Sequence, residues 1–226
     1  MREQLSRFEP SPCDEVCWRT PRPVLIEPWH PARDQAEAFI EARFRSAFGA
    51  QPNTAYPIIS ALFQDDGRIA AAAGVRFPEE TPLFLERYLD EPIESAVALA
   101  FARPVIRASI VEIGSFAALG VAPALALFGA LSAWLAGPCG RLYAVATARP
   151  ELERLLRRSG FALRAVADAE AARLGESAAA WGTYYDAAPR VFVGEIKASP
   201  VLPALGGRLH ARSARSALRG ASRSCS

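Results

Sequence analysis

Apolar residues recur along this chain with both helical and strand-like periods. In the segment after Asp34, they return near helical spacing and end at a glycine: Ala36, Phe39, Ile40, Phe44, Phe48 and then Gly49. This pattern predicts an amphipathic helix with Asp34 as its N-cap and Gly49 as its stop signal.

Extended apolar runs alternate with further helical segments. Strands are predicted at residues 24–26, 56–63, 68–77, 109–116, 142–147 and 191–196, and helices at 83–89, 92–101 and 150–159. Asp66-Gly67 predicts the turn of a β-hairpin, because glycine tolerates the positive φ that such turns need. The order predicts an α/β fold with a mixed α+β sheet, in which one twisted central sheet is flanked by helices.

One long segment has no charged residue, and it permits two interpretations. It runs from Ile113 to Gly140, and its central part is long enough to cross a bilayer. Pro123, the high content of alanine and glycine, and the strand-like run before it favour a buried helix. We therefore expect residues 119–134 to form a helix packed on a sheet, with a membrane span as the alternative.

Composition bounds the number of domains and the compartment. The chain has 226 residues, of which 51% are hydrophobic and 22% are charged, as expected for one globular domain. We expect a flexible arm at residues 1–23, a domain at 24–198, and a disordered tail rich in Arg, Ser and Ala at 199–226. No cysteine framework, metal-binding spacing or signal peptide is recognisable, so we expect a cytoplasmic protein without a bound metal.

Three dense segments carry a family resemblance: LFLERYLDEPIES at 83–95, SIVEIGSFA at 109–117 and WGTYYDAAPRVFVGEI at 181–196. Together they resemble the bacterial thermostable hemolysin family, from about Arg43 to Ile196. That family's fold looks like the acyltransferase fold of GCN5-type N-acetyltransferases (GNAT) and acyl-homoserine-lactone synthases, which make autoinducers. The resemblance implies a GNAT-like domain and acyl-transfer chemistry, whereas the family name records only a lytic phenotype.

Two residues are the candidates for catalysis. Glu112 is the one carboxylate in an apolar strand, and burial there would raise its pKa toward the range of a general base. The segment VEIGSF is similar to the glutamate-bearing central strand of lactone synthases. Arg76, in GVRFPEETPLF, resembles an arginine at the end of their third strand, and its guanidinium suits the carboxylate of an acceptor. The alternative for Glu112 is a structural salt bridge with Arg76 or Arg107.

Further residues are candidates for binding the substrates. Four of them lie in LFLERYLDEPIE, which we interpret as a lid or as a helix packed on the sheet, and three lie near the central and last strands: Glu86, Tyr88, Asp90, Glu94, Ser115, Trp181 and Tyr184. Ser115 stands where the family pattern favours Asn. Trp181 and Tyr184 form an aromatic cluster with Tyr185, which indicates either core packing or contact with an acyl chain.

The donor of the acyl group is expected to be a thioester, with no tightly bound cofactor. The segment SFAALGVAPA lacks the Q/R-x-x-G-x-G/A turn that holds the pyrophosphate of coenzyme A in acetyltransferases. An acyl carrier protein is therefore an alternative donor to acyl-CoA, and its acidic surface would match the arginines of residues 154–164. The acceptor is expected to be a small amine, nucleic acid is not expected as a partner, and the Arg-rich tail is a candidate contact for a membrane surface.

Three functions are thus open at this stage. The first is an N-acyltransferase, the second a membrane-active lytic protein, and the third a non-catalytic module that binds acyl groups. An enzyme whose acylated product is surface-active would account for a lytic phenotype without membrane insertion of the protein.

Overall fold

The computed structural model describes residues 23–51 and 55–197. Within them, the strands are β1 (Val24–Ile26), β2 (Ile58–Phe63), β3 (Ile69–Arg76), β4 (Ile110–Ala118), β5 (Tyr143–Ala148), β6 (Leu163–Asp168) and β7 (Arg190–Glu195). The α-helices are α1 (Arg33–Phe48), α2 (Ile93–Phe101), α3 (Val121–Ala136) and α4 (Pro150–Arg158). Shorter 3₁₀ segments are η2 (Phe84–Tyr88), η3 (Arg107–Ser109), η4 (Ala171–Trp181) and η5 (Tyr184–Ala187).

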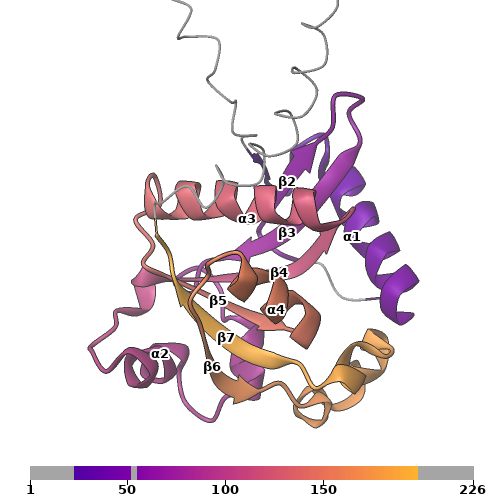
Figure 1. The fold of residues 1–226 in the computed structure, drawn as a ribbon. Coiled ribbons are helices and arrows are strands. Elements are labelled where there is room, and N and C mark those ends of the chain that lie inside the picture. The colour runs from indigo at the N-terminus through magenta and orange to yellow at the C-terminus, as the bar shows by residue number, and fades with distance from the viewer. Residues whose placement is uncertain (1–22, 52–54, 198–226) are drawn as a thin grey trace, which may run out of the picture.

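The strands form one mixed sheet in the order β1-β2-β3-β4-β5-β7-β6. Only β4 and β5 are parallel among the paired strands described, and all other neighbours are antiparallel. The last strand, β7, lies between β5 and β6 rather than at an edge. The predicted mixed sheet flanked by helices is therefore confirmed (Figure 1).

Helices cover both faces of the sheet. On one face, Leu127 and Leu131 of α3 and Leu156 of α4 pack on Val111 and Ile113. On the other face, α1 packs on β2 to β4, while η2, α2 and η4 cover the central and C-terminal strands. The period-two alternation of β4 thus directs Val111 and Ile113 toward α3 and directs Glu112 toward η2.

Helix α3 is the uncharged segment, and its packing decides between the two interpretations of its sequence. Seven of its residues are buried, among them Leu127, Leu131 and Leu135. The expected helix on the sheet is confirmed, and none of the helices described has both the length and the hydropathy that crossing a bilayer requires.

Two details of the sequence prediction were wrong. Helix α1 begins at Arg33 after Ala32, so Asp34 lies in its first turn, where a carboxylate is favoured by the helix dipole, and does not cap it. Strand β6 was missed because its alternating residues are small or charged and half of them are exposed, as suits an edge strand. The predicted arm and tail lie almost entirely outside the described residues.

Candidate functional site

Strands β4 and β5 separate part-way along their length. They pair at Ile110, Val111 and Glu112, where Glu112 lies opposite Val145. Beyond that point β4 runs on to Ala118 beside β3, while β5 continues beside β7. Two neighbouring strands of one sheet therefore diverge from a vertex at Glu112.

A β-bulge shapes β4 just past this vertex. The register with β3 shifts between Gly74 and Ala72, and Ser115 has a φ of 47°, in the left-handed region. The ring of Tyr56 lies over Gly74 and Gly114, and a Cβ at either glycine would overlap it. The two glycines thus make the space in which Tyr56 is buried against the central strands.

A cavity of about 450 Å³ occupies the divergence of the two strands. Its lining on the side of α3 and α4 is apolar and includes Phe116, Phe128, Leu152, Leu156, Phe161 and Leu163. Its lining on the side of α1 and η2 is aromatic and includes Phe48, Tyr56, Tyr88, Trp181, Tyr184 and Tyr185. The cavity therefore joins an apolar compartment on one face of the sheet to an aromatic compartment on the other.

Glu112 lies at the vertex, lines the cavity and is 2% exposed. Its two carboxylate oxygens accept hydrogen bonds from the backbone N–H groups of Phe84 (2.8 Å) and Leu85 (3.1 Å), at the start of η2. Arg76 Nη1 is 3.8 Å from Oε2 of Glu112. Burial outweighs these stabilising contacts and raises the pKa of Glu112 to about 7.

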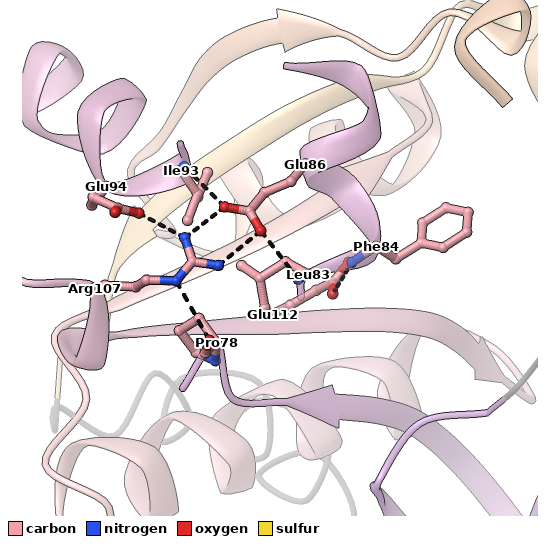
Figure 2. A network of polar contacts seen from close by, with 8 residues as sticks. All are labelled: Pro78, Leu83, Phe84, Glu86, Ile93, Glu94, Arg107 and Glu112. Carbon is pink, nitrogen blue, oxygen red and sulfur yellow. Dashed lines mark hydrogen bonds and ion pairs between the residues drawn. The ribbon is translucent and has the colours of Figure 1, made fainter. Parts of the chain in front are cut away.

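A second network of charges fixes η2 and α2 next to Glu112 (Figure 2). Arg107 donates to both oxygens of Glu86, at 2.6 and 2.8 Å, and to Glu94 at 2.7 Å. Glu86 also accepts from the backbone N–H groups of Leu83 and Ile93. The hydrogen bond from Arg107 is the main cause that lowers the pKa of Glu86. The geometry supports a packed segment rather than a lid, because this network ties η2 to the start of β4.

The phenols of the aromatic compartment lie close together. The hydroxyls of Tyr88 and Tyr185 are hydrogen-bonded, and Tyr184 donates to the carbonyl of Thr147 at 3.3 Å. Burial raises the pKa of Tyr88 to about 12 and that of Tyr184 further. These groups are therefore neutral hydrogen-bond donors at physiological pH.

One close contact closes the aromatic compartment. Gly182, with a φ of 51°, lies against the carbonyl of Phe48, where a Cβ would overlap backbone atoms. Thr183 donates its N–H to the same carbonyl at 2.9 Å. The connection between η4 and η5 is thereby fixed to the end of α1.

The sequence matches the family model named thermostable hemolysin over residues 26–200, which is most of the chain. The chain belongs to the thermostable hemolysin family. A search of the curated proteins finds no significant match to this family member.

Solved structures with the same fold include two acyl-transferring synthases. BjaI, a CoA-dependent acyl-homoserine lactone synthase solved with MTA, has 13% identity and a TM-score of 0.53, over 78% of this chain and 83% of its own. FeeM, an N-acyl amino acid synthase from uncultured soil microbes, has 15% identity and a TM-score of 0.50, over 75% of this chain and 93% of its own. At these identities the similarity establishes that this chain has a GNAT-like fold.

Apart from Arg76, the site residues expected from the sequence divide into three groups. The cavity is lined by Glu112, Ser115, Tyr88, Trp181 and Tyr184. Glu86 and Glu94 lie behind it and bind Arg107. Asp90 is 81% exposed in its side chain and pairs with Arg173, so the structure does not bring it to the cavity.

Arg76 lies beside Glu112 but does not line the cavity. Its guanidinium packs on the ring of Tyr56, with its carbon 4.6 Å from the ring centre, and donates to the carbonyl of Ala55 at 2.9 Å. A further donation reaches the carbonyl of Pro82 at 3.5 Å. The protein's own carbonyls thus accept from the two terminal nitrogens of the guanidinium that the sequence assigned to an acceptor carboxylate, while Nε is buried without a hydrogen-bond partner.

Three residues that line the cavity were not predicted from the sequence, namely Tyr56, Thr147 and Arg149. A signal for Tyr56 existed, since an isolated glycine within a strand indicates close approach of another group, and Gly74 and Gly114 both lie in strands. Among the residues described, no three His, Cys, Asp or Glu side chains are grouped so as to hold a metal ion.

Proposed function

We propose that this protein is an N-acyltransferase that moves an acyl group from the thioester of a carrier protein or of CoA to a small amine. The observation that carries the proposal is the cavity at the divergence of β4 and β5, with an apolar compartment on one side of Glu112 and an aromatic compartment on the other. A thioester at the vertex would place its acyl chain and the acceptor in different compartments.

The apolar compartment has the lining that an acyl chain needs. The rings of Phe116 and Phe128 pack at a tilt with their centres 4.6 Å apart, and Phe161 extends the same aromatic group toward β6. Transfer of each methylene from water into such an environment contributes roughly 0.8 kcal/mol. The acyl chain would lie between α3, α4 and the sheet.

Glu112 is the group placed to take a proton from the acceptor amine. Each carboxylate oxygen accepts one backbone hydrogen bond and keeps a further lone pair for the amine or for a water between them. A pKa of about 7 suits a general base at neutral pH. The burial of Glu112 at the vertex therefore supports its assignment as the base, because it fixes the carboxyl group in place and raises its pKa.

The proposed reaction is a single acyl transfer. The amine nitrogen attacks the thioester carbonyl, a C–N bond forms, and the C–S bond breaks to release the thiol of the donor. The amine proton passes to Glu112 and then to the leaving sulfur or to solvent. Backbone N–H groups of β4 beyond Glu112, where pairing with β5 has ended, are the candidate donors to the developing oxyanion.

The first test compares lipids from cells that do and do not express the protein. Mass spectrometry should find a new N-acyl species with the wild-type protein, and none with the variant Ala146→Phe. Ala146 lines the cavity, so a phenyl group there would fill the space of the acyl chain.

Ala165→Phe is the matched control, because Ala165 is an exposed alanine on strand β6. It should leave the product unchanged. An unaltered lipid profile with the wild-type protein, in cells supplied with amines and thioester donors, would refute the proposed function.

A further inference from the structure

Two hydrogen-bond donors at the end of β5 line the cavity without a hydrogen-bond partner. The hydroxyl of Thr147 and Nε of Arg149 are both buried, and neither makes a hydrogen bond to any group that the structure describes. Unpaired buried donors are uncommon in folded proteins, since each costs the free energy of its lost hydration. Their presence in one cavity points to a ligand that supplies acceptor oxygens.

Both side chains belong to the wall of the aromatic compartment. Val145 packs with η2 and β7 on that face, and Thr147 and Arg149 follow it at steps of two residues. The guanidinium carbon of Arg149 lies 4.6 Å from the ring centre of Phe48 in α1, which fixes its plane. Arg149 is the one cation among the described residues that line the cavity, and the carboxylates of Glu112, Glu151 and Glu195 line it too, so an anionic group would bind at Arg149 and not elsewhere on the wall.

The interaction of Arg149 with the protein leaves it available to a ligand. Its Nε lies 3.4 Å from Oε2 of Glu151, whose side chain is 61% exposed, whereas that of Arg149 is 22% exposed. An ion pair with an exposed carboxylate contributes little to stability, because water screens the charges. A ligand oxygen that is shielded from water within the cavity would compete with Glu151 effectively.

We propose that Thr147 and Arg149 bind the carboxylate of the acceptor, so that the acceptor is an amino acid. This inference rests on the proposed function. Glu112 is paired with Val145, and Thr147 lies two residues further along β5, which is about 7 Å in a strand. That spacing accommodates an amine beside Glu112 and a carboxylate beside Thr147, as an amino acid presents them. The product would be an N-acyl amino acid.

The test measures binding of the product, and it does not require turnover. The probes are N-dodecanoyl-leucine and N-dodecanoyl-isoamylamine, which differ only in the carboxylate. By isothermal titration calorimetry, the wild-type protein should bind the acid roughly 10- to 100-fold more tightly, the range expected of charge-assisted hydrogen bonds. Arg149→Met should abolish this preference, Thr147→Val should reduce it, and Arg149→Lys should retain part of it.

Arg43→Met is the matched control, because Arg43 is exposed on α1 and does not line the cavity. It should keep the full preference for the acid. Circular dichroism and the unfolding midpoint establish that each variant is folded. Equal binding of the two probes by the wild-type protein, or no binding of the acid, would overturn the inference, as would a preference that survives in the double variant of Thr147 and Arg149.

A phosphate of the donor is the other source of an anion, and a second titration separates it. If Arg149 binds the donor, Arg149→Met should weaken binding of 4′-phosphopantetheine relative to pantetheine and leave the preference for N-dodecanoyl-leucine intact, which would overturn the inference. A preference for the acid that depends on Arg149, without any acyl transfer to amino acids, would uphold the anion site and reject the proposed enzyme.

Discussion

At Glu112, two opposing effects act on one carboxyl group. The N–H groups of Phe84 and Leu85 and the charge of Arg76 favour the carboxylate, whereas burial favours the neutral acid. Burial dominates, and the pKa rises to about 7. The residue is therefore both an anchor for the start of η2 and a group that changes its charge near neutral pH.

Replacement of Glu112 by Gln separates these two roles. Gln keeps the shape and one acceptor oxygen but cannot take a proton, so acyl transfer should fall by roughly two to four orders of magnitude. The initial rate of product formation at saturating substrates measures this loss, with circular dichroism to confirm folding. Full turnover by the folded variant would assign Glu112 to structure alone.

The raised pKa of Glu112 also predicts a dependence of stability on pH. The folded state holds this proton up to a pKa of about 7, whereas the unfolded chain releases it near the ordinary value of 4.5. Between these values the folded state binds more protons, so its stability falls as the pH rises. The wild-type protein should lose up to about 3 kcal/mol of unfolding free energy across this window relative to Glu112→Gln. Urea titrations of both proteins at pH 4.5 and 7.5 test this, and parallel curves would contradict it.

At the scale of elements, η2 is fixed to β4 by charge as well as by packing. Arg107 precedes β4 in sequence and holds Glu86 of η2 and Glu94 of α2. Glu112 receives its hydrogen bonds from η2. The charged side chains of Arg107, Glu86 and Glu94 therefore position the proposed base although they do not line the cavity.

The coupling between Arg107 and Glu86 should be measurable. In a double-mutant cycle of Arg107→Gln and Glu86→Gln, we expect a coupling free energy of about 1 to 3 kcal/mol in urea unfolding, since the bonds are bidentate and partly buried. Each single variant should also shift the pH profile of acyl transfer, because η2 supplies the donors to Glu112. Additive effects on stability and an unchanged pH profile of acyl transfer would show that the network of Arg107 plays no part in positioning Glu112.

The contact of Tyr56 with the central strands gives a second prediction. Gly114→Ala should lower the unfolding free energy by about 1 to 3 kcal/mol, because its methyl group overlaps the hydroxyl of Tyr56. In the background Tyr56→Ala this cost should largely disappear. The same cost in both backgrounds would place the strain in the backbone of β4.

Most of the strands and α-helices were predictable from the sequence, whereas strand β6 and the 3₁₀ segments η3, η4 and η5 were not. Hydrophobic period and glycine turns located β2, β3, β4 and α3 within a few residues, because each has a run of apolar residues that pack on a partner. Strand β6 has Arg164 and Asp168 among small residues and takes its conformation from pairing with β7. The local sequence of β6 does not encode this pairing, because β7 follows only after η4 and η5.

At the scale of the whole molecule, the site depends on which segments the fold brings together. Glu112 was recognisable because a lone carboxylate in an apolar strand is conspicuous. Thr147 and Arg149 were not, because they resemble any residues at the end of a strand until the divergence of β4 and β5 exposes them to a cavity. The surroundings of Arg76 were not predictable either, since its partners Ala55 and Pro82 come from the loops before β2 and after β3, which the fold brings together.

The chain beyond residue 199 should be dispensable for folding. Its composition is dominated by Ala, Ser, Gly and Arg and offers few large apolar groups to offset the conformational entropy of ordering it. A protein that ends at Ser199 should unfold within about one degree of the full chain in a thermal scan. A midpoint lower by several degrees would show that the tail contributes to the folded state.

The central position of β7 has a consequence for synthesis of the protein. Strands β5 and β6 leave the ribosome before β7, yet in the sheet each meets the other only through β7. Until β7 arrives, β5 has an unpaired apolar edge, which is a template for association with other chains. The nascent chain therefore passes through a stage in which the sheet is open and the cavity is unfinished. Termination before Arg190 would leave a fragment with this edge of β5 exposed, and we expect that fragment to aggregate.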